Sequence, residues 1–288
     1  MTFSIVARSA DGRHFGVAVA SKFLAAGSIV PAAGVTVDGR PGGALATQAF
    51  ANVGYRAEGL GLLAEGRTAR QTVEALTNSD EQAAQRQLGV VDANGEGATY
   101  TGAECEPWAG GATGYGYAIQ GNILAGSRVV ALMEEAWLAS DQRGPLSRRL
   151  LAALAAGDAA GGDSRGKQSA ALYVVGAGGG YGGSDVLVDL RVDDHQEPVA
   201  ELARLLDLHD LVFGRPDPDT LLDLDGPLAA EVTGLLSERG YSGEPAKALE
   251  AWAGRENLEM RLVDGKIDPV VLEYLRKAGN GAGKGTGS

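Results

Sequence analysis

Short apolar segments joined by tight-turn residues are the feature of this sequence that most limits its fold. Residues 2–8 (TFSIVAR) and 14–21 (HFGVAVAS) flank the pair Asp11-Gly12. An Asp-Gly pair between two β-rich segments is a strong hairpin signal, and a hairpin pairs its two strands antiparallel. Two more hairpins are predicted on the same pattern, from residues 86–93 with 97–102 and from residues 169–175 with 185–192.

Amphipathic helical patterns separate these hairpins. The order of strands, helices, strands and helices, without βαβ crossovers, favours antiparallel sheets covered by helices. The predicted fold class is therefore a layered α+β architecture. The expected helices are residues 54–65, 68–77, 127–140, 145–156 and 198–213, and further single strands are expected at 43–49 and 117–122.

A change in composition near residue 214 divides the chain. Residues 214–226 (GRPDPDTLLDLDG) are rich in Pro and Asp, which is typical of a linker. We therefore expect a main domain over 1–213, a small helical domain over 227–277 and a flexible glycine-rich tail over 278–288.

The charge balance excludes several classes of partner. The 288 residues include 25 Lys and Arg against 37 Asp and Glu, a net charge of −12. Binding to nucleic acid or to an anionic membrane needs a basic surface, so neither is expected. We find no apolar stretch of about 20 residues and no basic region followed by an apolar run, so we expect a cytoplasmic protein without a signal peptide.

Metal and phosphate chemistry have little support in the sequence. The three histidines, His14, His195 and His209, are scattered and lack paired cysteines, so no metal site and no cofactor are expected. The glycine run 176–183 (GAGGGYGG) lacks the lysine and the following helix of a phosphate loop. It is interpreted as the loop of a hairpin.

The search for a nucleophile leads to the start of the chain. No serine lies in a Gly-x-Ser-x-Gly elbow, and the single cysteine, Cys105, lies between two glutamates that would raise its thiol pKa. Thr2 follows Met1, and removal of Met1 would leave a hydroxyl and a free α-amine on one residue. An α-amine has a pKa of about 7.7–8.0, so it is a base already tethered to the nucleophile. The alternative is that Thr2 simply suits a strand because it is β-branched.

Several long segments of this chain recur together, in the same order, in a known family. They are TFSIVAR, GVAVASKFLAAGSIVP (16–31), ATQAFANVGY (46–55), RQLGVVDA, QGNILAG (120–126) and GDAAGGDSRGKQSAALYV (157–174). On these segments the chain resembles the bacterial family filed as domain of unknown function 1028, whose members look like N-terminal-nucleophile (Ntn) hydrolases. On residues 235–243, 248–262 and 267–276 the C-terminal part resembles a small helical module labelled peptidoglycan-binding, although the missing signal peptide argues against a cell-wall location.

The resemblance implies a four-layer αββα sandwich with the nucleophile at the edge of one sheet. Thr2 would be the nucleophile and its amine the base, and Lys22 would tune the amine pKa or orient the substrate, the alternative being a solvent-exposed lysine. Thr47 and Gln48 end a strand where related enzymes use a backbone N–H for the oxyanion, and Arg165 is a candidate clamp for a substrate carboxylate. The remaining candidates near substrate are Ser21, Gln120, Asn122, Asp163, Gln168 and Ser169, each of which could instead be satisfied in a turn or cap.

The predicted activity is hydrolysis of a small amide through an acyl-enzyme on Thr2, in a protein that forms homo-oligomers. Two alternatives stay open. One is a non-catalytic protein of the same fold that binds a ligand or a peptidoglycan fragment, and the other is a structural or assembly component.

Overall fold

The computed structural model describes residues 2–38, 40 and 42–278, and it is a mixed α+β structure with several sheets and eight α-helices. The predicted α+β class is therefore confirmed. The chain divides between Leu205 and Leu206 into two compact units, within helix α5 (Pro198–Phe213).

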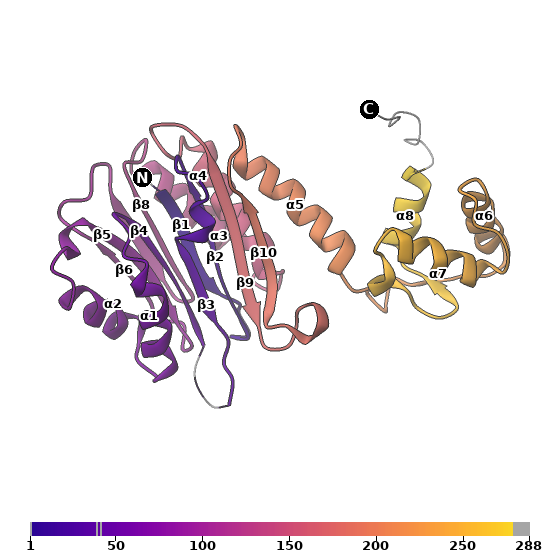
Figure 1. The fold of residues 1–288 in the computed structure, drawn as a ribbon, viewed down its shortest axis with the longest axis horizontal. Coiled ribbons are helices and arrows are strands. Elements are labelled where there is room, and N and C mark those ends of the chain that lie inside the picture. The colour runs from indigo at the N-terminus through magenta and orange to yellow at the C-terminus, as the bar shows by residue number, and fades with distance from the viewer. Residues whose placement is uncertain (1, 39, 41, 279–288) are drawn as a thin grey trace. The chain divides into compact units, whose positions relative to one another are not determined.

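A six-stranded antiparallel sheet carries the start of the chain (Figure 1). The first hairpin forms as predicted, with Phe3 opposite Ala20 and Arg8 opposite Phe15. The first strand is nevertheless central in the sheet, because the strand at 117–122 pairs along its other side. In sheet order the strands are β10 (Val186–Val192), β9 (Ser169–Gly176), β2 (His14–Ser21), β1 (Thr2–Arg8), β8 (Tyr117–Asn122) and β7 (Gly110–Gly114).

A second, four-stranded antiparallel sheet faces the first. Its strands are β3 (Pro31–Gly34), β4 (Gly43–Ala49), β5 (Arg86–Asp92) and β6 (Gly97–Thr101), in that order. One buried core joins the two sheets, with Val6 and Val17 from the first against Ala44, Ala46 and Val91 from the second.

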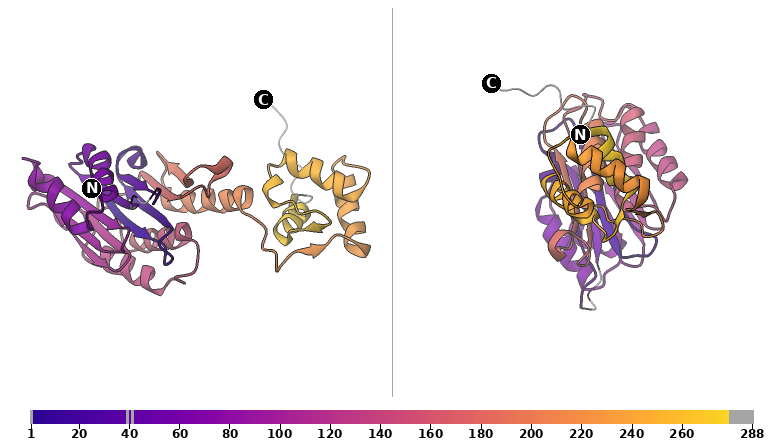
Figure 2. Two further views of the ribbon diagram at one scale, coloured as in Figure 1. Left: turned by 90° about the horizontal axis from the view of Figure 1, so that it is seen from below. Right: turned by 90° about the vertical axis from the view of Figure 1, so that its right-hand side faces the viewer.

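Helices cover the outer faces of both sheets (Figures 1 and 2). Leu63 and Leu76 pack with Leu45 and Leu88 on the outside of the four-stranded sheet. On the six-stranded sheet a Cβ on Gly157 would lie 3.2 Å from the ring of Phe3, which shows how closely helix and strand approach. The helices are α1 (Gly54–Ala64) and α2 (Ala69–Asn78) on the first face, and α3 (Arg128–Ala139) and α4 (Leu146–Ala159) on the second.

Strand alternation decides which residues of β1 enter the space between the sheets. Successive side chains point to opposite faces. Val6 belongs to the core between the sheets and Phe3 contacts the helical side, so Thr2 and Ser4 share the face of Val6. Strands β3 and β7 were not predicted. Their sequences, PAAG and GGATG, are poor in β-branched residues, and pairing with β4 and β8 makes them strands.

The C-terminal unit has a core of its own. Trp252, Leu236 and Leu272 are buried together, and the guanidinium of Arg261 lies 2.6 Å from the carboxylate of Asp268. Leu222–Asp223, which fall in the predicted linker, form strand β11 and pair with β12 (Lys266–Ile267). The helices are α6 (Gly226–Ser237), α7 (Pro245–Arg255) and α8 (Pro269–Ala278), and the predicted tail lies outside the described residues from 279 onward.

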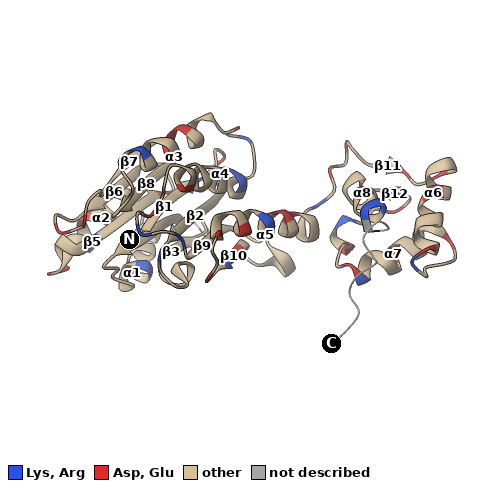
Figure 3. Ribbon diagram, turned by 90° about the horizontal axis from the view of Figure 1, so that it is seen from above, with Lys and Arg blue, Asp and Glu red and all other residues tan. Residues whose placement is uncertain are grey.

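Charged residues lie mainly on helices and loops, so the strands of the two facing sheets are mostly tan in Figure 3. Of the helices in the described part of the chain, none has the length and apolar character needed to cross a membrane.

Candidate active site

Thr2 lies at the end of the central strand β1, where three strands meet. It is opposite Asn122 of β8 in register, and its hydroxyl oxygen lies 3.1 Å from that of Ser21 on β2. Thr2 is only 7% exposed and Ser21 only 2%. The two hydroxyls therefore form a nearly buried pair at one end of the space between the sheets.

The residues behind Thr2 form a polar layer inside an otherwise apolar core. We call Ser4, Gln48, Gln87, Gln120 and Asn122 the interlayer amide cluster; all five are at most 2% exposed. Ser4 Oγ donates to Gln48 Oε1 and accepts from Gln120 Nε2, both at 2.6 Å. These bonds join β1 and β8 of one sheet to β4 of the other.

Backbone carbonyls fix the directions of the Gln48 and Gln87 amides in this cluster. Gln48 Nε2 lies 3.2 Å from the carbonyl oxygen of Thr2, and Gln87 Nε2 lies 2.7 Å from that of Gly121. A carbonyl can only accept, so both Nε2 atoms are donors and both Oε1 atoms are acceptors. Asn122 Nδ2 donates to Gln87 Oε1 at 2.9 Å. The Oδ1 atom of Asn122 is then an acceptor without a hydrogen-bond partner among the described residues.

A second group of predicted residues shapes the turn after β2. The buried carboxylate of Asp163 accepts the backbone N–H of Lys22 at 2.6 Å and that of Arg165 at 2.9 Å. Ser169 Oγ donates to the carbonyl of Phe23 at 2.6 Å and accepts from Ala26 N at 3.1 Å. Both side chains thus hold the loop that carries Phe23 beside Thr2.

The other predicted residues bond away from the Thr2 hydroxyl. Lys22 is exposed and its Nζ donates to the carbonyl of Lys167 at 3.2 Å. The guanidinium of Arg165 lies 3.4 Å from the Asp163 carboxylate, and Gln168 Nε2 donates to Asp194 at 3.2 Å. Thr47 Oγ1 donates to the carbonyl of Asn52 at 3.2 Å, and its backbone N–H donates to Val30 at 3.1 Å. Of the predicted set, the structure therefore gathers Thr2, Ser21, Gln48, Gln120 and Asn122 on the facing surfaces of the sheets.

Two cavities of about 300 Å³ each open at this end of the sandwich. Ala49 and Phe50 line both of them. The first, the Thr2 cavity, is lined by Thr2, Phe23, Ala26, Ile29, Val30, Gln48, Ala49, Phe50, Ala51 and Val53. The second, the Asn122 cavity, is lined by Ala49, Phe50, Gln85, Glu104, Cys105, Glu106, Asn122 and Ile123.

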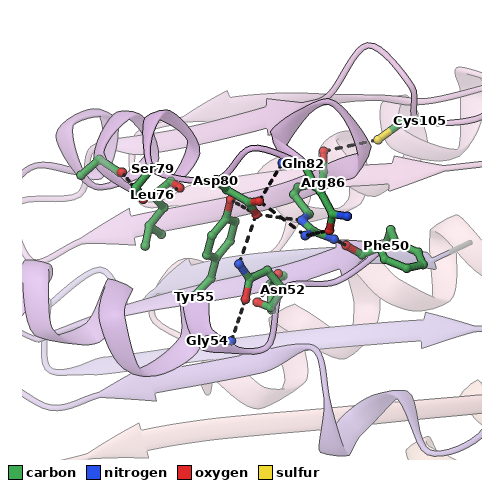
Figure 4. A network of polar contacts seen from close by, with 12 residues as sticks. Phe50, Asn52, Gly54, Tyr55, Leu76, Ser79, Asp80, Gln82, Arg86 and Cys105 are labelled. Carbon is green, nitrogen blue, oxygen red and sulfur yellow. Dashed lines mark hydrogen bonds and ion pairs between the residues drawn. The ribbon is translucent and has the colours of Figure 1, made fainter.

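A buried ion pair, Asp80 with Arg86, holds the loop that follows β4 and carries Phe50 (Figure 4). Asp80 Oδ2 accepts from Arg86 Nε and from the Tyr55 hydroxyl, both at 2.8 Å, and from Asn52 Nδ2 at 3.1 Å. Arg86 NH1 in turn donates to the carbonyl of Phe50 at 2.5 Å. The bond from Arg86 is the main cause of a pKa of Asp80 well below its ordinary value.

Backbone strain is concentrated at the borders of the two cavities. Ala49 and Ile123, which line them, have φ angles of +67° and +49°, and Ala25, beside the lining residue Ala26, has +52°. Non-glycine residues rarely adopt this left-handed region, and such strain is common at functional sites. Cys105 also lines the Asn122 cavity, and its thiol pKa is raised mainly by burial.

Sequence reasoning missed Ser4, Gln87 and the Asp80–Arg86 pair. A signal for the cluster was present, because each of the segments ATQAF, RQLGV and AIQGN carries one glutamine within a buried strand. Buried polar side chains require partners, so three such strands in one chain indicate a shared polar layer. Among the described residues no group of His, Cys, Asp or Glu is placed to hold a metal ion.

Two known families match separate parts of the chain. Residues 2–202 match the family described as "Family of unknown function (DUF1028)", and residues 212–275 match the "Putative peptidoglycan binding domain". The chain belongs to the DUF1028 family. The crystal structure of protein SPO2555 from Silicibacter pomeroyi, described as DUF1028, is 29% identical with a TM-score of 0.64, over 80% of this chain and 92% of that one. Comparison with curated proteins gives no match.

Proposed function

We propose that this protein is an N-terminal-nucleophile amidohydrolase that hydrolyses a small amide through an acyl-enzyme on Thr2. The observation that carries the proposal is the position of Thr2, nearly buried at the end of a central strand and lining a cavity large enough for a small molecule. Two facing antiparallel sheets with helices on both outer faces support an αββα sandwich of the Ntn type.

The proposed reaction begins once Met1 has been removed. The α-amine of Thr2 takes the proton of the Thr2 hydroxyl as Oγ1 attacks the substrate carbonyl. The Ser21 hydroxyl, 3.1 Å away, orients this oxygen. The C–N bond then breaks, the proton passes to the leaving amine, and the acyl group stays on Thr2 as an ester. Water hydrolyses that ester by the same proton route, releasing a carboxylic acid and restoring Thr2.

Backbone N–H groups are the proposed donors to the oxyanion. The N–H of Thr47 already donates to Val30. We therefore assign this role to the end of β4 and the loop that follows it, where Ala49 and Ala51 line the Thr2 cavity. Asp80 and Arg86 fix this loop through Asn52 and Phe50.

The first experiment is to label the purified protein with a β-lactone and to locate the label by mass spectrometry. Attack by Thr2 opens the lactone and adds its whole mass to the N-terminal peptide. We expect a chain beginning at Thr2, with labelling there that is lost in Thr2→Ala and kept in Thr113→Ala, a change at an exposed threonine of β7. Retained Met1 in an unlabelled protein would refute the proposal.

A second candidate function rests on the C-terminal unit. The match of residues 212–275 to a peptidoglycan-binding family supports recognition of a cell-wall fragment by this unit. Co-sedimentation of the full chain with purified peptidoglycan tests it, and Thr2→Ala should bind as well as the native chain. Absence of co-sedimentation would remove this candidate.

A further inference from the structure

The two cavities at the end of the sandwich differ sharply in chemistry. Thr2 lines one of them, and Asn122, its register partner, lines the other. The residues common to both, Ala49 and Phe50, form a shared wall. The two cavities therefore adjoin one register pair, Thr2 on the first side and Asn122 on the second.

The Thr2 cavity is lined almost wholly by apolar side chains. Among the described residues, Thr2 and Gln48 are its only polar lining residues, and none of the lining residues has an ionisable side chain. Phe23, Phe50 and Val53 are 53%, 65% and 50% exposed, so large apolar groups face solvent around this site. A charged substituent would lose hydration here without gaining a partner, which is costly. This cavity therefore suits an uncharged, compact apolar group.

The Asn122 cavity has the opposite character. Among the described residues, Glu104 and Glu106 line it and no Lys or Arg does. Glu104 accepts a hydrogen bond from Gln85 at 3.0 Å and has no Lys or Arg partner in the described part of the chain. Asn122 is 2% exposed and lines this cavity, and its Oδ1 has no hydrogen-bond partner among those residues. An acceptor and two carboxylates together favour a ligand that carries N–H donors and positive charge.

We propose that the substrate is a small amide formed from an apolar carboxylic acid and an amine that carries a second, positively charged nitrogen. The acyl half occupies the Thr2 cavity because it stays bonded to Thr2 after the C–N bond breaks. The amine half lies in the Asn122 cavity, where Asn122 Oδ1 accepts the amide N–H and the two glutamates face the cation. This assignment rests on the proposed function.

Binding to the Thr2→Ala variant tests the assignment without turnover. Three isobutyryl amides of equal length differ only in the end of the amine: the monoamide of 1,5-diaminopentane and the amides of hexylamine and 5-aminopentanoic acid. We expect calorimetry to rank them cationic, neutral, anionic, with the first about fivefold to tenfold tighter than the second. The succinyl amide of the same diamine should bind more weakly than the isobutyryl amide, because it places a carboxylate in the Thr2 cavity.

Two double variants that remove the same number of carboxylates distinguish an effect of the Asn122 cavity from an effect of the protein's net charge. Glu104→Gln/Glu106→Gln on the Thr2→Ala background should abolish the preference for the cationic amide. Glu74→Gln/Glu135→Gln, which removes two exposed helical carboxylates, should leave that preference intact. Equal binding of the three amides, a preference for the anionic one, or no binding of any would overturn the assignment, even if Thr2 is still labelled by the lactone. If the three amides keep the expected order of affinity but the lactone does not label Thr2, the proposed hydrolase activity is refuted and the proposed ligand preference of the two cavities stands.

Discussion

Replacement of Asp80 by asparagine is expected to destabilise the N-terminal unit and to loosen the wall shared by the two cavities. The Asp80 and Arg86 side chains are only 11% and 7% exposed. Asparagine has nearly the same shape but no charge, and it replaces one acceptor oxygen by an NH2 group. Either that NH2 meets the backbone N–H of Gln82, which now donates at 2.9 Å, or it meets the donors of Arg86, Tyr55 and Asn52.

The size of the effect follows from the charge left behind. Removing one partner of a buried ion pair costs about 3–5 kcal/mol. The lower end applies here, because Phe50 and Gln82 still accept from the Arg86 guanidinium. A loss of about 3 kcal/mol in a unit of about 200 residues lowers Tm by about 6–12 °C.

Thermal unfolding of the full chain gives Tm. Amide hydrogen exchange of β5, which belongs to the N-terminal unit, then reports the loss of stability in that unit alone. The pKa of Asp80 is lower in the folded state than its ordinary value of 3.8. The stabilisation by the ionised form is therefore complete above that value and is lost as the pH falls toward the depressed folded pKa. The difference between native chain and variant should be constant from pH 5 to 8 and about 1 kcal/mol smaller at pH 3.

Two further variants decide whether the unpaired charge is the cause. Adding Arg86→Gln to Asp80→Asn should recover part of the lost stability, because no buried cation then lacks a partner. Glu201→Gln, which breaks the exposed pair with Arg204, should not measurably change Tm. An unchanged Tm in Asp80→Asn, or a loss of equal size at pH 3, would refute the reasoning.

Two more predictions concern the interlayer amide cluster and use urea denaturation as the measurement. Ser4→Ala leaves the amide atoms of Gln48 and Gln120 that Ser4 bonds at 2.6 Å without partners, and should cost about 2–4 kcal/mol; a loss below about 1 kcal/mol would contradict this. Gly89→Ala should cost about 1–3 kcal/mol, because its Cβ would lie 1.9 Å from Gln120 Oε1, whereas Gly61→Ala, with open space inside α1, should stabilise by about 0.5–1 kcal/mol. Equal effects of the two alanines would show that space around Gly89 is not limiting.

Several elements of this fold could be predicted because their signals are local. The Asp11-Gly12 turn and its flanking apolar segments determine the first hairpin, and the strands at 2–8 and 14–21 have the predicted bounds. The full six-stranded sheet was harder to predict from the sequence. Its strand β7 is mostly glycine, and only pairing with β8, a contact made in the folded chain, gives it strand geometry.

The candidate site divides in the same way. The sequence alone places a hydroxyl and a potential amine at Thr2, and the family resemblance supplies Ser21 and Lys22 as neighbours. In the tertiary structure the Ser21 hydroxyl lies 3.1 Å from that of Thr2, whereas Lys22 Nζ donates to the carbonyl of Lys167. The reason is that β2 ends at Ser21, so Lys22 already lies in the turn whose backbone the Asp163 carboxylate holds.

The amide cluster and the two cavities depend wholly on tertiary structure. Gln48, Gln87 and Gln120 are far apart in the sequence, and each looks like an isolated polar residue in an apolar strand. Their partners are determined by which strands face each other and in which register, and these are long-range properties of the packed sheets. The sequence by itself determined most of the strands, the hairpin turns and the position of a threonine at the start of β1. Only packing decided which polar groups meet there, because buried polar side chains are stable mainly where the facing sheets supply hydrogen-bond partners.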